Sequence, residues 1–203
     1  MNTQIKNEPP NRDRHWTVLL IGGASGTGKS SLAYRIADLC AISVLEVDDV
    51  FQAVKAVTAK EILPAMHYWS DGINWTDIGV SGNVNWLINA GKEMAPALKA
   101  IVDRHIEDKV PVIIEGDFIC PEFAMSFDHP EVKSLFVTEP DREQLLQNFF
   151  AREGGDLQHF RADVSAAHGD WISETCRKLG IELIESRPWD TVLHRAVSCM
   201  RDR

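Results

Sequence analysis

The chain has 203 residues, of which 44% are hydrophobic, enough for one sizeable core in one α/β domain. Its net charge of −9 argues against a surface that wraps nucleic acid by neutralising phosphates. The four cysteines are far apart and show no zinc-ligand spacing, and no run approaches the ~20 apolar residues of a membrane span.

The first segment, residues 1–14, is polar, with two adjacent prolines and mixed charge, and it is predicted to be a flexible tail. It also lacks the apolar core of a secretory signal. Because the separated cysteines are typical of reduced thiols, we expect a cytoplasmic protein with no membrane partner. The folded part is expected to be a single domain over residues 15–203.

The second segment begins with the apolar run Trp16–Ile21, which ends in two glycines and predicts a strand buried on both faces. Residues 29–40 then place apolar side chains at helical spacing, which predicts the first helix. Residues 42–47 predict a second strand, with Asp48 and Asp49 at its carboxyl end. Open α/β sheets place their ligand crevice at that edge.

The next segment, residues 50–108, is too long for a simple crossover between strands. It contains helical patches near both ends, and residues 67–82 between them show no clear period. We therefore expect a helical insertion on the substrate side of the domain.

The remaining chain again alternates strand and helix signals. A Gly154-Gly155 break after the fourth strand's helix suggests a mobile lid over residues 152–164. The expected strands are 110–115, 132–137 and 181–184, and the expected helices are 141–152, 166–179 and 191–200. This alternation predicts a three-layer α/β/α sandwich with a parallel sheet.

The motif GxxxxGK[ST] occupies the loop between the first strand and helix. Glycines let backbone N–H groups turn toward phosphate oxygens, and the helix N-terminus adds its dipole. Lys29 is expected to reach the β- and γ-phosphates, and the Ser30 hydroxyl to bind Mg²⁺. A Gly-rich turn that only caps a helix is the alternative. The predicted nucleotide-binding residues are Gly23, Ala24, Ser25, Gly26, Thr27, Gly28, Lys29, Ser30, Ser31 and, from the loop after the fifth strand, Pro188.

The motif predicts phosphate binding but not a reaction, so the carboxylates at the strand ends should indicate which reaction the site catalyses. Glu115 ends an apolar run and Asp117 follows it, which predicts a Mg²⁺ site together with Ser30; the alternative is that these acids cap the next segment. Asp48 is the preferred base for a substrate hydroxyl. Alternatively Asp48 binds metal-bound water and Asp49 caps a helix beginning at Val50, and Asp117 is a third candidate base.

Arginines are expected to supply further positive charge for the phosphate groups. Arg142, Arg152 and Arg161 surround the glycine break, and Arg152, immediately before it, is the preferred lid residue that contacts the transferring phosphoryl group. The alternative is that they are solvated side chains paired with nearby acids. After the fifth strand, Pro188 or Trp189 is expected to pack on an adenine; the alternative is a plain turn with Asp190 as a helix cap.

These pieces together resemble the P-loop small-molecule kinases, in the nucleoside-monophosphate-kinase-like and 2-phosphoglycerate-kinase-like group. The resemblance rests on GASGTGKSS at 23–31, VDD at 47–49, VIIEGD at 112–117, the break after Arg152, and RPWD at 187–190. It implies a five-stranded parallel sheet of order 2-3-1-4-5, with a substrate subdomain after the second strand and an Arg-bearing lid after the fourth. It also implies that Asp48 faces the acceptor.

The predicted function is that of an ATP- and Mg²⁺-dependent phosphotransferase acting on a small-molecule hydroxyl or phosphate acceptor. Adenylate-kinase-like chains of this group carry an arginine after the second strand's helix, whereas residues 50–80 contain none. The resemblance therefore favours a hydroxyl-bearing metabolite or another less anionic substrate over a nucleoside monophosphate. An NTPase that hydrolyses ATP or GTP and a nucleotide-binding protein without turnover are the alternatives. The acceptor and the oligomeric state are open at this stage.

Overall fold

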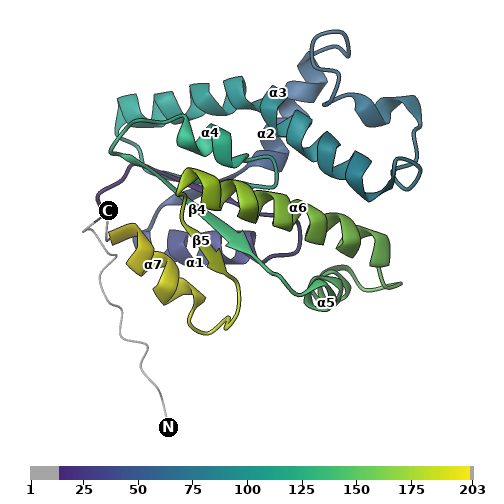
Figure 1. Cartoon of the computed structure of the whole chain (residues 1–203). Helices are drawn as coiled ribbons and strands as arrows, with labels where there is room; N and C mark the ends of the chain where they lie inside the picture. The colour runs from purple at the N-terminus through teal and green to yellow at the C-terminus, as the bar shows by residue number, and fades with distance from the viewer. Residues whose placement is uncertain (1–13, 202–203) are drawn as a thin grey trace.

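The computed structural model describes residues 14–201, so the predicted tail lies outside the described residues except for Arg14. Strands and helices alternate along the chain as predicted (Figure 1). Most boundaries fall within two residues of the predicted ones, which is the usual uncertainty at element ends. The elements are β1 Val18–Gly22, α1 Lys29–Cys40, β2 Ser43–Glu46, α2 Val47–Val57, the 3₁₀ helix η1 Tyr68–Asp71, α3 Gly79–Asp108, β3 Val112–Gly116, α4 Pro121–Met125, β4 Val132–Thr138, α5 Arg142–Glu153, α6 His159–Leu179, β5 Leu183–Glu185 and α7 Val192–Arg201.

The five strands form one parallel sheet in the order β2-β3-β1-β4-β5, which confirms the predicted order. The central strands β1 and β3 are buried along their whole length, as expected from their continuous apolar runs. Ile21 pairs in register with Glu115, and Gly22 with Gly116. The loop that follows β1 therefore starts beside the acidic end of β3.

Helices cover both faces of the sheet (Figure 1). One apolar cluster joins the sheet to α2, α3, α4 and α6, and a second joins its opposite face to α1 and α7. Alternate residues of β1 divide between the two clusters, with Leu20 in the first and Leu19 and Ile21 in the second. The architecture is therefore the predicted three-layer sandwich.

Helix α2 begins at Val47, directly after β2, and this corrects the prediction of a helix starting at Val50. Asp48 and Asp49 lie in its first turn, and Glu46 is the N-cap residue, without a side-chain capping bond. Asp49 is therefore not the cap. Acidic side chains are favourable in the first turn because they face the positive end of the helix dipole.

The two predicted helical patches of the insertion lie in α2 and in the second half of α3, but α3 is a 30-residue helix that begins earlier than predicted, at Gly79. Three glycines and Pro96 weakened the helical signal. Gly91 has a packing role: a Cβ atom there would lie 2.6 Å from the Cys120 sulfur and 2.7 Å from the Phe118 carbonyl oxygen. The helix thus needs glycine where it crosses the segment after β3.

The connection between α5 and α6 is shorter than predicted. Helix α6 starts at His159 rather than Ala166, so only residues 154–158 separate the two helices. The short helix α4 was also not predicted. None of the helices in residues 14–201 is long and apolar enough to cross a membrane.

Candidate functional site

The loop between β1 and α1 has the backbone that its glycines were predicted to allow. Gly28, the residue before α1, has a φ of 87°, and Gly23 approaches β4 so closely that a Cβ atom would lie 2.4 Å from the Val137 carbonyl oxygen. The Thr27 hydroxyl donates a hydrogen bond to the Ala24 carbonyl oxygen at 3.0 Å and holds the turn. The loop therefore presents the N-terminus of a 12-residue helix to the cavity beside it.

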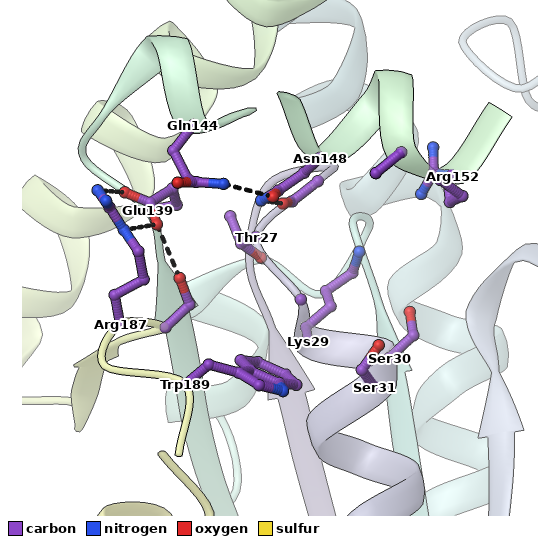
Figure 2. Close-up of a pocket in the computed structure, with 14 residues that line it drawn as sticks. Thr27, Lys29, Ser30, Ser31, Glu139, Gln144, Asn148, Arg152, Arg187 and Trp189 are labelled. Carbon is purple, nitrogen blue, oxygen red and sulfur yellow. Dashed lines mark hydrogen bonds and ion pairs between the residues drawn. The ribbon is translucent and has the colours of Figure 1, made fainter. Parts of the chain in front are cut away.

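That cavity, called here the P-loop cavity, has a volume of about 590 Å³ (Figure 2). Its walls come from the loop and α1, from the end of β4, from α5 and from the loop after β5. The lining residues are Gly26, Thr27, Gly28, Lys29, Ser30, Ser31, Glu139, Gln144, Asn148, Ala151, Arg152, Ser186, Arg187 and Trp189. Six of the ten predicted nucleotide-binding residues, Gly26 to Ser31, are thus brought together with three segments distant in sequence.

A second cavity of about 300 Å³, called here the acidic cavity, adjoins it. It is lined by Ser25, Lys29, Ser30, Glu46, Asp48, Glu115, Gly116, Asp117, Arg152 and Arg161. Lys29, Ser30 and Arg152 line both cavities. All the residues predicted from the sequence as catalytic or metal-binding therefore surround one space.

Lys29 is only 8% exposed and forms an ion pair with Asp117. Burial by itself lowers the pKa of this amine, but the charges of Asp117, Glu115 and Asp48 outweigh burial and raise the pKa above its ordinary value. The side chain is therefore a permanent cation at the point where the two cavities meet.

Glu115 is the most buried acid of the cavity, at 3% exposure, and its Oε2 atom has no hydrogen-bond partner among the described residues. Burial raises its pKa, whereas Lys29 and a hydrogen bond from Ser30 lower it. An orphaned carboxylate oxygen next to a serine hydroxyl fits a hydrated Mg²⁺ ion. Within residues 14–201 no group of three or more His, Cys, Asp or Glu side chains forms a ready-made metal cage, and Mg²⁺ at phosphates does not need one.

Asp48 lines the acidic cavity. The surrounding protein removes part of its hydration, which raises its pKa, and the negative charge of Asp117 raises it further; Lys29 acts in the opposite direction. A carboxylate with a raised pKa is a better proton acceptor than an ordinary surface aspartate. Asp49 does not line either cavity.

The three arginines around the glycine break have different surroundings. Arg142 bonds to Asp163 and Glu143 and lines neither cavity. Arg152 and Arg161 both pair with Glu153 and lie over the Phe149 ring, 5.6 and 4.4 Å from its centroid. These two guanidinium groups are therefore held at the acidic cavity by the partly exposed carboxylate of Glu153 and the buried ring of Phe149.

Comparison with known proteins agrees with this geometry. No protein-family model matches the chain. The 2-phosphoglycerate kinase of Methanocaldococcus jannaschii is 24% identical over 92% of the chain and 63% of its own length, and that of Methanococcus vannielii is 29% identical over 94% and 66%. Among solved structures, a shikimate kinase from Acinetobacter baumannii has a TM-score of 0.57 at 15% identity, covering 96% of the chain and 100% of that protein.

In sequence the chain is similar to these 2-phosphoglycerate kinases, and in fold to this shikimate kinase, which supports a P-loop kinase group. A gluconokinase from Sinorhizobium meliloti shares the fold, with a TM-score of 0.50 at 18% identity over 93% of both chains. The chain spans 63% of the length of the first of these curated relatives, so the relatives contain sequence for which this chain has no counterpart.

One part of this site was not predicted. Glu139 follows β4 and accepts two hydrogen bonds from Arg187, at 2.7 Å each, and one from the Ser186 hydroxyl at 3.0 Å (Figure 2). Of the two residues of the same loop that were predicted to pack on an adenine, Trp189 lines the P-loop cavity and Pro188 does not. An acid after an apolar strand was the available signal, since the same pattern identified Glu115.

Proposed function

We propose that this chain is an ATP- and Mg²⁺-dependent phosphotransferase that transfers the γ-phosphoryl group to a small molecule. The observation that carries the proposal is the pair of adjoining cavities with Lys29, Ser30 and Arg152 in both. A nucleotide in the P-loop cavity would have its terminal phosphate where the acidic cavity begins. A hydrolase needs room for one water at that place, whereas a cavity of about 300 Å³ has room for an acceptor.

Each residue of the two cavities has a distinct role in this proposal. Backbone N–H groups of the loop and the Lys29 ammonium would bind the phosphates, and Ser30 with Glu115 and Asp117 would hold hydrated Mg²⁺. When bound, Mg²⁺ neutralises charge on the phosphate oxygens. Asp48 would accept the proton of the attacking hydroxyl, and Arg152 would stabilise the charge of the transferring group.

Residues 50–108 and 152–164 are proposed as the substrate-side insertion and the lid of this domain. Trp75 of the insertion and Phe160 at the start of α6 form an edge-to-face contact with ring centroids 4.8 Å apart. Because Arg161 lines the acidic cavity and follows Phe160 directly, this contact supports an arrangement in which the insertion and the lid meet next to that cavity. Exclusion of water there would favour transfer over hydrolysis.

The names of the relatives suggest 2-phosphoglycerate as the first acceptor to test. Arg152 and Arg161 would bind its anionic groups, while the hydroxyl would face Asp48. The four free thiols of Cys40, Cys120, Cys176 and Cys199 support the accompanying proposal of a reducing, cytoplasmic environment.

The test is an ATP-consumption assay with Mg²⁺ in which single acceptors are added in turn: 2-phosphoglycerate, glycerate, gluconate, shikimate and nucleoside monophosphates. We expect one acceptor to accelerate consumption and to be recovered as a phosphorylated product. Consumption of ATP at the same rate with every acceptor would indicate a hydrolytic NTPase rather than a kinase. Binding of ATP without any consumption would indicate a nucleotide sensor.

A further inference from the structure

Two side-chain amides connect α5 to the P-loop. The Asn148 amide nitrogen donates a hydrogen bond to the Gly26 carbonyl oxygen at 2.8 Å, and the Gln144 amide nitrogen donates to the Asn148 amide oxygen at 2.9 Å. The two residues are one helical turn apart on α5, and both line the P-loop cavity (Figure 2). They form a short relay that begins at the phosphate-binding loop and ends at Gln144.

The direction of every bond in this relay follows from its first member. A backbone carbonyl oxygen can only accept, so the Asn148 group that faces Gly26 must be its NH₂. The Asn148 oxygen therefore faces Gln144, and Gln144 must in turn present its own NH₂ to it. This leaves the Gln144 Oε1 atom as an acceptor that neither bond of the relay uses.

The other polar groups at this end of the cavity are already paired. Both oxygens of Glu139 accept from Arg187, and the Ser186 hydroxyl donates to the same carboxylate. Gln144 lies at the upper edge of the cavity and Trp189 at the lower edge in Figure 2. Trp189 is 39% exposed, and the guanidinium group of Arg35 lies over its ring, 5.4 Å from the centroid.

An aromatic side chain and an open acceptor are the two features that recognise a base carrying an amino group. We propose that the Gln144 Oε1 atom accepts a hydrogen bond from the exocyclic 6-amino group of adenine, with the base beside Trp189, and that Gln144 thereby makes the chain selective for ATP. This inference rests on the proposed function, because it assigns the base of the nucleotide that the P-loop would hold.

Guanine and hypoxanthine carry an oxygen at position 6. In the same pose that oxygen would face the Gln144 oxygen, and two acceptors without a proton between them repel each other. A site that pairs with an N–H group also discriminates against a base that lacks it, because the protein acceptor then loses its partner. Gln144 is therefore a specificity-determining residue in this proposal.

The test compares ATP with its 6-deamino analogue, purine riboside triphosphate, by calorimetric titration of the full chain with Mg²⁺ and no acceptor. We expect the chain to bind ATP about tenfold more tightly than the analogue, the value of one well-formed hydrogen bond. Inosine triphosphate should bind at least as weakly as the analogue.

Two matched variants locate the effect. Gln144→Met keeps the length and helix propensity of the side chain but removes the acceptor, so the ratio between ATP and analogue should fall to about one. Gln144→Glu keeps an acceptor and removes only the donor to Asn148, so it should retain the ratio even if both affinities fall. Far-ultraviolet circular dichroism confirms that both variants are folded.

An equal affinity of the unmodified chain for ATP and the analogue would overturn the assignment, as would an unchanged ratio in Gln144→Met. Both outcomes leave the proposed function standing, because ATP still binds. If no triphosphate binds at all, the proposed function fails and this inference fails with it.

Discussion

At the scale of single residues, the site is a small number of charges whose states depend on one another. Lys29 keeps its proton because three carboxylates face it, and Glu115 is tuned by Lys29 and Ser30. The sequence motif predicted the identity of these residues, but not that burial raises the pKa of two of the acids. Their contribution is therefore best tested one charge at a time.

Replacing Lys29 by Met should reduce ATP turnover by at least about 100-fold, because one preorganised positive charge at the transferring group is removed. Steady-state kinetics on the purified variant measures the loss. Lys99→Met is the matched control, since Lys99 is an exposed lysine of α3 that pairs with Asp103 and lines neither cavity. A Lys29→Met enzyme with full turnover would contradict the phosphate-binding role.

Replacing Asp48 by Asn should lower transfer much more than ATP affinity and should slightly raise stability at neutral pH. Burial and Asp117 hold the pKa of Asp48 above its unfolded value, so ionisation of Asp48 opposes folding above that pKa. The stability difference between the variant and the parent should then shrink as the pH falls through this pKa. Thermal unfolding over a pH series measures it, and the transfer rate of the parent should fall over the same range.

If Asp48→Asn leaves the transfer rate unchanged, the base is another residue, with Asp117 the remaining candidate in the cavity. A variant that is less stable than the parent at neutral pH would contradict the raised pKa. Asp49→Asn is the matched control, because Asp49 follows Asp48 in α2 but lines neither cavity.

At the scale of elements, the site is held by strand ends and by the loops that follow them. Glu139 at the end of β4 holds the loop after β5 through Arg187 and Ser186, and Asn148 of α5 holds the P-loop through Gly26. The nucleotide side of the site is thus connected across three separate segments. Such links lie between residues more than forty positions apart, which is why no local pattern in the sequence revealed them.

Replacing Glu139 by Gln should raise the KM for ATP several-fold with little change in kcat. The loop that carries Trp189 would lose the charged hydrogen-bond partner that fixes its position. The free energy of unfolding should fall by about 1.5–3 kcal/mol, the value of hydrogen bonds to a charged group. Chemical denaturation and ATP titration measure the two effects. Glu143→Gln, which changes an exposed acid of α5, is the control, and an Glu139→Gln variant with parental KM would contradict the link.

At the scale of the whole molecule, the sequence predicted the layers and the strand order but misplaced several boundaries. Buried parallel strands are continuous apolar runs, so they were recognised readily. Glycines and Pro96 hid the length of α3, and the first turn of α2 was assigned to a strand end because Asp48 and Asp49 break the apolar run. The sequence left Pro188 and Trp189 as alternatives at the cavity, because the course of this loop depends on its distant partner Glu139.

The central claim is that the γ-phosphoryl group of ATP passes to a small acceptor in the acidic cavity. Phosphorus NMR of a reaction containing ATP, Mg²⁺ and 2-phosphoglycerate, followed by the other acceptors one at a time, observes the destination of that group directly. The account predicts a new phosphoester signal that grows as ATP disappears and is absent with Lys29→Met. Inorganic phosphate as the sole product with every acceptor would contradict it.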